Sequence, residues 1–167
     1  MPVISASGKI LQIVSAAGDE SGDEGLATQT LSEFSLAATI TPISASSVIR
    51  IRWYGNFSVY LGSGSDISRR GFLAVQRAST AGEGSAANGT TIEGEKQVGH
   101  RLGGAEAGNQ TSWLGGGHYA AQEGSPGAGA AVVYTVCGRA NVANSTIQYD
   151  NDGSNKSRIV IEEVLEA

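Results

Sequence analysis

The sequence has 167 residues but only one cysteine, Cys137. A single cysteine cannot form an intramolecular disulfide, so a disulfide-stabilised secreted fold is not expected. The first 18 residues also lack the basic segment and apolar run of a signal peptide. We therefore expect the protein to be made and folded in a cytoplasm. Cys137 lies in an apolar segment, which predicts a buried, unreactive thiol.

Aromatic residues are also scarce, at 6% of the chain, and there are three prolines but 24 glycines. Few large side chains and many glycines predict short strands, many turns and a thin core. The length suits one domain of about 100–200 residues. We expect a single β-sandwich domain over residues 1–167, with a short N-terminal arm at 1–8. Because a partner subunit can complete a thin core, we also expect a homo-oligomer.

Positive charge is limited to 11 lysines and arginines against 16 acidic residues, a net charge of −5. This balance disfavours nucleic-acid binding. Two arginine pairs, Arg50 with Arg52 and Arg69 with Arg70, are interpreted as the solvated side of a strand or loop. No segment approaches the roughly 20 apolar residues of a membrane-spanning helix, so no membrane partner is expected.

Residues suited to metal or cofactor binding are few and isolated. His100 and His118 have no carboxylate or cysteine at ligand spacing. The segment GEGSAA at 82–87 fits G-x-G-x-x-A, but neither the strand nor the helix of a dinucleotide site flanks it. We expect no cofactor, no metal and no catalytic residues.

Two oxygen-rich segments leave calcium binding open, although a solvated turn is favoured for both because neither has the layout of an EF-hand. They are the loop DNDGSN at 150–155 and the acidic cluster Asp19, Glu20, Asp23 and Glu24. Five N-x-[ST] triplets are interpreted as a result of loop composition. They begin at Asn56, Asn88, Asn109, Asn144 and Asn155.

The clearest pattern is the segment FSLAATITPISASSVIRIRWYG at 34–55. Its apolar residues alternate, which predicts two strands that build a sheet with one buried face. The buried positions are Phe34, Leu36, Ala38 and Ile40, then Ile49, Ile51 and Trp53, while Arg50, Arg52 and Tyr54 point the other way. Pro42 and the serines that follow it predict a turn between the strands.

Similar patterns predict about ten strands and no amphipathic helix. The further strands are expected at 9–14, 57–61, 71–77, 96–102, 111–121, 130–140, 145–149 and 157–165. The segments 18–25, 78–94 and 123–129 are expected to be loops or turns, the second of them long and mobile. Many short strands joined by unequal loops favour an all-β, two-sheet sandwich of the jelly-roll type.

The segments KILQIVSA, LSEFSLAATITPISASSVIRIRWYG, FLAVQRAS, YTVCGRA and SRIVIEEV, in this order, resemble a family of small bacteriophage virion proteins. The matching positions are Leu11, Ile13, Ile40, Thr41, Pro42, Ser46, Ser47, Ile49, Ile51, Arg77, Ser79, Ile159, Ile161 and Glu163. Trp53 and Tyr54 are bulkier than the family pattern, and the segment 82–117 has no counterpart in it. The resemblance implies a trimeric jelly roll, similar to the tumour-necrosis-factor and C1q class, on the outside of the particle.

The resemblance implies a non-enzymatic phage virion protein, a homotrimeric capsid decoration (cement) protein that stabilises the shell by contacting the major capsid protein. Its location would be the capsid surface. The alternative is a head or tail fibre module that contacts a host receptor through glycine-rich loops. A sugar-active enzyme is a third class, for which the carboxylates to test are Glu93, Glu95, Glu162 and Glu163.

Overall fold

The structure, a computed structural model, describes residues 8–18, 24–61, 69–78, 89–101, 112–141, 145–150 and 157–166. These residues form ten β-strands and contain no helix, which confirms the all-β prediction. The strands are β1 (Lys9–Ala17), β2 (Glu24–Leu26), β3 (Ser32–Ile40), β4 (Val48–Leu61), β5 (Arg69–Ala78), β6 (Thr90–Arg101), β7 (Ser112–Gly124), β8 (Val132–Ala140), β9 (Ser145–Asp150) and β10 (Arg158–Leu165). Accordingly, this part of the chain offers no helix that could span a membrane.

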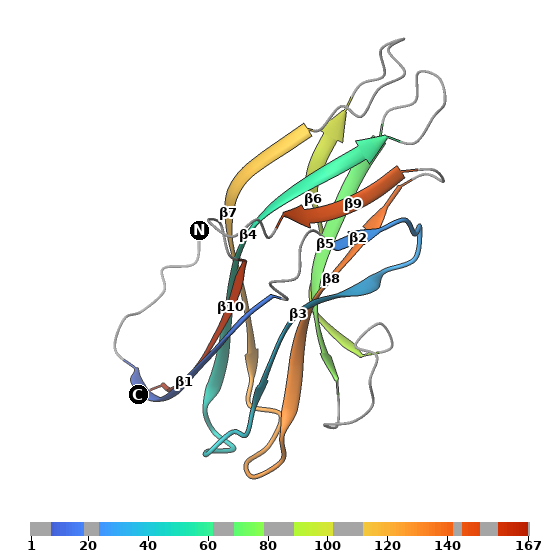
Figure 1. The fold of residues 1–167 in the computed structure, drawn as a ribbon. Helices are drawn as coiled ribbons and strands as arrows, with labels where there is room; N and C mark the ends of the chain where they lie inside the picture. Colours follow the sequence, from blue (N-terminus) through green and yellow to red (C-terminus); the bar gives the residue numbers. More distant parts are fainter. Residues whose placement is uncertain are drawn as a thin grey trace.

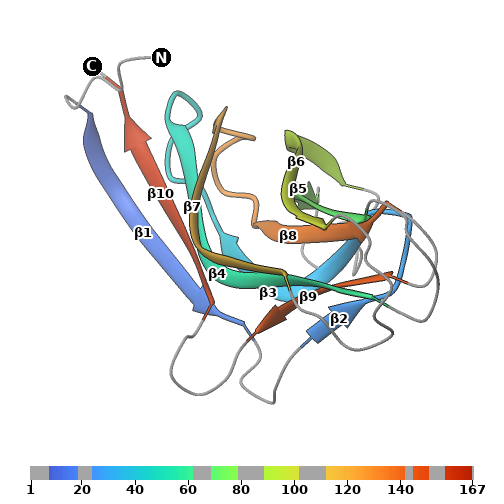
Figure 2. The same ribbon diagram turned by 90° about the horizontal axis from the view of Figure 1, so that it is seen from above.

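The strands form two antiparallel sheets (Figure 1). Sheet A has the order β1-β10-β4-β9-β2, and β7 also pairs with β4. Sheet B has the order β3-β8-β5-β6. The 14-residue β4 organises sheet A: β10 pairs with its residues 48–54 and β9 with 56–61, while β7 follows the other edge. Figure 2 shows β1, β10 and β4 in one layer and β8, β5 and β6 in the other.

The two strands predicted at 34–54 exist, and their alternation is confirmed. The predicted inward residues are all buried, including Leu36, Ile51 and Trp53, whereas Tyr54 on the other side is exposed. The expectation of one shared sheet was wrong, because β3 belongs to sheet B and β4 to sheet A. The chain crosses between the sheets at residues 41–47. The pairing of β3 ends at Ile40, and it cannot continue through Pro42 because proline has no amide hydrogen for a strand ladder.

Four predicted boundaries also need correction. The strands predicted at 48–55 and 57–61 are one strand, β4, with a register shift between Gly55 and Phe57 opposite β7. The expected loops at 18–25 and 78–94 end early, because β2 begins at Glu24 and β6 at Thr90. The turn expected at 123–129 begins later, because Glu123 still pairs with β4. In each case, pairing with a distant strand extends a strand into residues whose local sequence favours a strand only weakly.

The core lies between the sheets and draws on both. Its largest fully buried apolar members include Trp53 and Ile161 from sheet A and Leu36 and Tyr134 from sheet B. Phe34 and Phe57 make an edge-to-face contact across the two layers, with ring centroids 5.8 Å apart. With few aromatic residues available, most members of the core are isoleucine, leucine and valine.

Candidate interaction surfaces

Two turns meet at one end of the sandwich, in the lower part of Figure 1: residues 41–47, which follow β3, and residues 125–131, which precede β8. Backbone hydrogen bonds join them, from Ser125 N to Ser47 O at 2.9 Å and from Gly129 N to Pro42 O at 2.8 Å. Gly129 has a φ of 82°, a left-handed conformation that glycine adopts without steric cost. We call these two segments the uncharged end, because neither contains a charged residue.

The buried carboxylate of Glu163 holds the first of these turns in place. Glu163 is 0% exposed and lies on the inner face of β10. Its oxygens accept hydrogen bonds from the backbone amides of Ile43 and Ser44, both at 2.9 Å. They also accept hydrogen bonds from Ser47 Oγ at 2.6 Å and from Gln12 Nε2 at 2.7 Å. The carboxylate therefore connects β1 and β10 to the crossover between the sheets.

These donors outweigh the cost of burying the charge. Burial by itself disfavours the ionised form of Glu163, but the hydrogen bonds from Ser47, Ile43, Ser44 and Gln12 favour it and lower the pKa to about 2. Glu163 is consequently charged at neutral pH. An ionised carboxylate forms stronger hydrogen bonds than a neutral acceptor, so the turn 41–47 is firmly attached.

The resemblance singled out both Ser47 and Glu163 as structural positions, and the structure brings them into direct contact. Gln12, the fourth donor, was not identified from the sequence. The available signal was that Glu163 shares one face of its strand with Ile159 and Ile161. A glutamate on a buried face requires hydrogen-bond donors, and serine-rich turns are rich in them.

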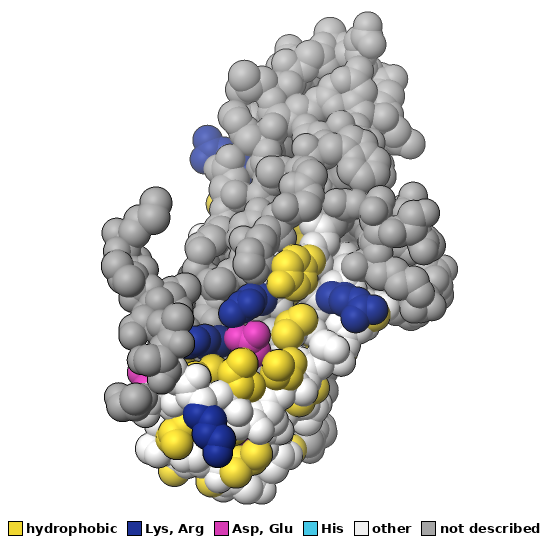
Figure 3. All heavy atoms as spheres, turned by 90° about the vertical axis from the view of Figure 1, so that its left-hand side faces the viewer, with side chains coloured by type: hydrophobic (Ala, Val, Ile, Leu, Met, Phe, Trp, Pro, Cys, Tyr) yellow, Lys and Arg dark blue, Asp and Glu magenta, His cyan; other side chains and the backbone are white. Residues whose placement is uncertain are grey.

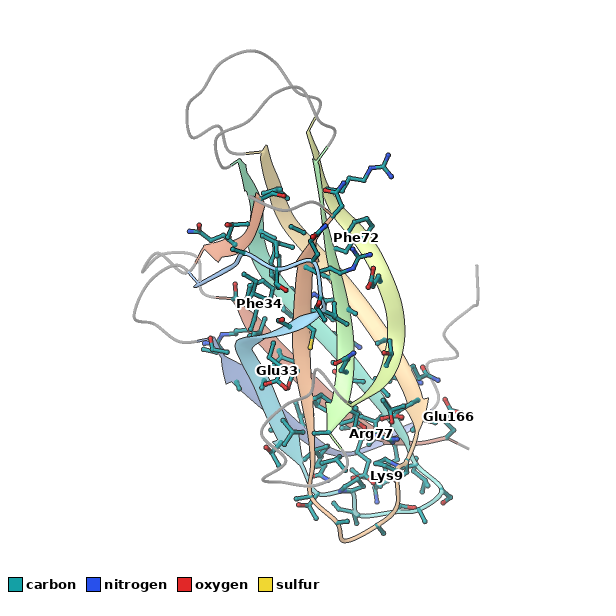
Figure 4. All side chains as sticks on the ribbon, turned by 90° about the vertical axis from the view of Figure 1, so that its right-hand side faces the viewer. Lys9, Glu33, Phe34, Phe72, Arg77 and Glu166 are labelled. Atoms are coloured by element: carbon teal, nitrogen blue, oxygen red, sulfur yellow. The ribbon has the colours of Figure 1, made fainter. Side chains whose placement is uncertain are left out.

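A second polar network joins the sheets near the same end. Glu123 of β7 accepts a hydrogen bond from the hydroxyl of Tyr134 on β8 and pairs with Arg77 of β5 at 2.9 Å. Figure 4 shows Arg77 toward the same end as Lys9 and Glu166, away from Phe72. Burial, and then the hydrogen bond to Glu123, raise the pKa of Tyr134, so its hydroxyl remains a donor. Arg77 is another position at which the chain resembles the phage proteins, and its ion pair with Glu123 joins sheet B to sheet A.

The outer face of sheet A carries exposed apolar residues beside ion pairs. Ile10 and Ile13 on β1 are 51% and 58% exposed, and Tyr54 on β4 is 40% exposed. Arg52 and Glu162 form a salt bridge at 3.0 Å. Figure 3 shows apolar side chains gathered around basic and acidic ones on this side of the molecule. Exposed apolar side chains that form a contiguous patch can take part in protein–protein contact.

The carboxylates considered for an enzyme do not come together. Glu162 points outward from β10 and Glu163 inward. Glu95 belongs to β6 of sheet B and pairs with Arg139, which also stacks over Phe72. The side chain of Glu93 lies outside the described residues. Those that are described thus occupy separate surfaces and have cationic or hydrogen-bonding partners.

Some of the other predicted positions can be compared with the structure, and the rest lie outside the described residues. Cys137 is buried, as predicted, and burial followed by the charge of Glu33 raises the pKa of its thiol to about 12. Arg70 is exposed, as expected for solvated surface, whereas the side chain of Arg50 is only 17% exposed and contacts Glu166 at 3.5 Å. Several positions lie outside the described residues or have undescribed side chains. They are the arm at 1–7, Asp19, Glu20, Asp23, the side chain of Glu24, the five Asn-x-Ser/Thr asparagines, Arg69, Ser79, the segment 82–87, His100, His118 and residues 151–155.

Within the described ranges, no group of three or more histidine, cysteine, aspartate or glutamate residues could hold a metal ion.

Comparison of the sequence with protein-family models and with curated proteins gives no match. Similar solved structures include the VP2 subviral particle of infectious bursal disease virus. It is 11% identical over 92% of this chain and 40% of that chain, with a TM-score of 0.27. The CBM22-1 xylan-binding domain from Paenibacillus barcinonensis Xyn10C is 16% identical over 96% of this chain and 97% of that chain, with a TM-score of 0.28.

This chain therefore spans about 40% of the length of the viral protein. Similarities at these scores carry no argument about function, and the architecture rests on the strand pairing itself.

Proposed function

We propose that this chain is a non-enzymatic structural protein of a bacteriophage particle, a homotrimeric jelly roll that decorates the outside of the capsid. The observation that carries the proposal is the contact between Ser47 and Glu163, which are 116 positions apart. The segments that resemble phage virion proteins include a serine-rich turn and a glutamate in the last strand. Because Ser47 donates a hydrogen bond to Glu163, both motifs belong to one buried hydrogen-bond network.

The strand order supports the jelly-roll part of the proposal. If β2 and β9 are set aside and the other eight strands are numbered along the chain, sheet A has the order 1-8-3-6 and sheet B the order 2-7-4-5. The chain thus alternates between sheets, and its first and last long strands are neighbours. This interleaving is the arrangement of an eight-stranded jelly roll.

The trimeric part is supported by the outer face of sheet A, where Ile10 and Ile13 would be removed from water by a neighbouring copy. Each trimer would bridge capsid subunits and bury surface only in the assembled shell. A ligand that binds one state alone stabilises that state by mass action, which is how such a protein would strengthen a capsid.

Two measurements test the proposal. Light scattering of the purified chain should give three times the monomer mass of 17.0 kDa, and a stable monomer would contradict the trimer. Densitometry of purified virions should then give on the order of hundreds of copies per particle, as capsid symmetry requires. Copy numbers on the order of tens would instead favour the fibre module. Turnover of a polysaccharide that Glu162→Gln or Glu95→Gln abolishes would overturn the non-enzymatic assignment.

A further inference from the structure

Side chains of three strands meet in rows on the outer face of sheet A. Residues directly opposite each other in antiparallel strands point to the same side of the sheet. Tyr54 of β4 lies opposite Arg158 of β10. In a second row, Glu162 of β10 lies between Ile13 of β1 and Arg50 of β4. The exposed apolar residues and the charged residues of these strands therefore share one surface, part of which is visible in Figure 3.

This surface is basic although the chain as a whole is acidic. Its rows hold three arginines against one carboxylate, a local charge of +2. They are Arg50, Arg52, Arg158 and Glu162. Lys9 at the start of β1 and Glu166 just after β10 add one charge of each sign and cancel. Apart from these six residues, the chain has seven lysines and arginines and fourteen acidic residues, a charge of −7. One face therefore has the opposite sign to the rest of the chain.

Arg158 is the cation of this surface that is left without a carboxylate. Arg52 pairs with Glu162, and Arg50 contacts Glu166. No described residue forms an ion pair with Arg158, which is exposed. Arginine can bind a carboxylate through two parallel hydrogen bonds, and arginine and tyrosine are among the residues that contribute most to protein interfaces. The surface is thus suited to a partner that brings a carboxylate to Arg158 and covers the neighbouring apolar side chains.

We infer that the outer face of sheet A binds an acidic surface of a second copy of this chain, so that neighbouring copies join head to tail. The inference rests on the proposed function, in which this face joins the copies of a trimer. If two copies met face to face about a two-fold axis, a charge of +2 would oppose a charge of +2, which costs free energy. Head-to-tail contact instead places the basic face against the acidic remainder of the next copy. Such contacts close into rings, as in a trimer.

The charge distribution also argues against a nucleic acid or an anionic membrane as the occupant. Either would extend beyond the basic face and meet the remaining charge of −7, which repels it. A nucleic acid would in addition leave the exposed Ile10, Ile13 and Tyr54 uncovered. The apolar centre of a protein interface covers such side chains. An acidic protein surface of limited size, such as that of the next copy, fits both observations.

The test measures the dissociation of oligomers of the full-length chain by sedimentation equilibrium, at ionic strengths of about 0.1 M and about 1 M. Arg158→Glu reverses the unpaired charge. Arg70→Glu is the matched control, because Arg70 is an exposed arginine of β5 in sheet B and its reversal changes the net charge equally. At the lower ionic strength, Arg158→Glu should raise the dissociation constant at least about tenfold and Arg70→Glu should leave it unchanged. The difference should shrink at the higher one, because salt screens exposed charges.

Two further measurements keep the result independent of any folding defect. Arg158→Ala should show a smaller loss than Arg158→Glu, in the same direction. Wild type itself should dissociate more readily at the higher ionic strength. Urea midpoints equal to wild type, measured on dissociated protein, would show that both Arg158 variants are folded.

Trimers of Arg158→Glu as stable as those of wild type would overturn the inference and leave the proposed trimer standing. Equal weakening by Arg70→Glu would also overturn it, because net charge rather than this face would then be responsible. A monomeric or dimeric wild type would overturn both the inference and the trimer. If such a monomer bound duplex DNA or vesicles of anionic lipid, and Arg158→Glu did not, the face would belong to a polyanion instead.

Discussion

The two faces of β10 use adjacent glutamates in opposite ways. Glu162 lies on the outer face of sheet A in a partly solvated salt bridge with Arg52, whereas Glu163 lies inside with four donors from β1 and the turn 41–47. A solvated ion pair gains little because water competes for both charges, but a buried carboxylate must keep all its partners. Position relative to the sheet, rather than residue type, determines what each glutamate contributes.

The largest contrast is expected between isoleucines on the two faces of sheet A. Ile161 is 0% exposed in the core, so Ile161→Ala leaves a cavity and should lower the free energy of unfolding by about 2–5 kcal/mol. Ile13→Ala on the outer face should change it by less than about 0.5 kcal/mol when measured on dissociated protein. Urea denaturation of both variants measures the difference, and equal losses would contradict the two-faced sheet.

Removing the charge of Glu163 should have the next largest effect. Glu163→Gln places an amide among donors that require an acceptor, which should cost about 1–3 kcal/mol of unfolding free energy at pH 7. Glu162→Gln is the matched control, with the same chemical change one residue away on the outer face. A loss for Glu162→Gln as large as that for Glu163→Gln would contradict the contrast between the faces.

The pH dependence of stability separates the same two residues. The pKa of Glu163 is lowered from 4.5 to about 2 in the folded protein. Its contribution is therefore complete above pH 4.5 and is lost as the pH falls toward 2. The shift corresponds to on the order of 3 kcal/mol. Thermal unfolding between pH 6 and 2 should show a steeper decline for wild type than for Glu163→Gln, and parallel curves would contradict the assignment.

A smaller effect is expected at the second network between the sheets. Tyr134→Phe keeps the ring in the core but removes the hydroxyl that donates to Glu123. Because Arg77 still pairs with this carboxylate, the loss should be about 1 kcal/mol, measured as a shift in urea midpoint with an unchanged slope. A neutral result would mean that Arg77 alone is sufficient.

The smallest effect is expected on the outer face. Arg52→Ala removes the salt bridge to Glu162 and should lower the unfolding free energy by less than about 1 kcal/mol, and by less still at high salt. A salt titration of the variant and wild type measures this. A large loss that salt does not reduce would show that Arg52 supports the fold through packing.

Alternation within single strands was enough to predict much of the fold. The buried positions on β3 and the first half of β4 are all as predicted, as are the all-β class and the burial of Cys137. The segment 90–94 was not recognised as strand, because glycine, alanine, serine and threonine dominate the segment 78–94 and its strand depends on pairing with β5. The uncharged end and its exposed Ile43 could not be recognised from the sequence, since they depend on two turns that are more than 75 residues apart.

By itself, the sequence determined that the chain consists of strands, and which side of several strands is apolar. Both follow from the alternation of side chains between the two faces of a strand, which is visible within a few neighbouring residues. Only the tertiary structure decided that β3 and β4 belong to opposite sheets and that β9 and β10 share one edge of β4. It also decided which groups donate hydrogen bonds to the carboxylate of Glu163, namely Gln12, Ile43, Ser44 and Ser47. Partners so distant in the chain are selected by the burial and hydrogen bonding of the whole sandwich, which no local pattern contains.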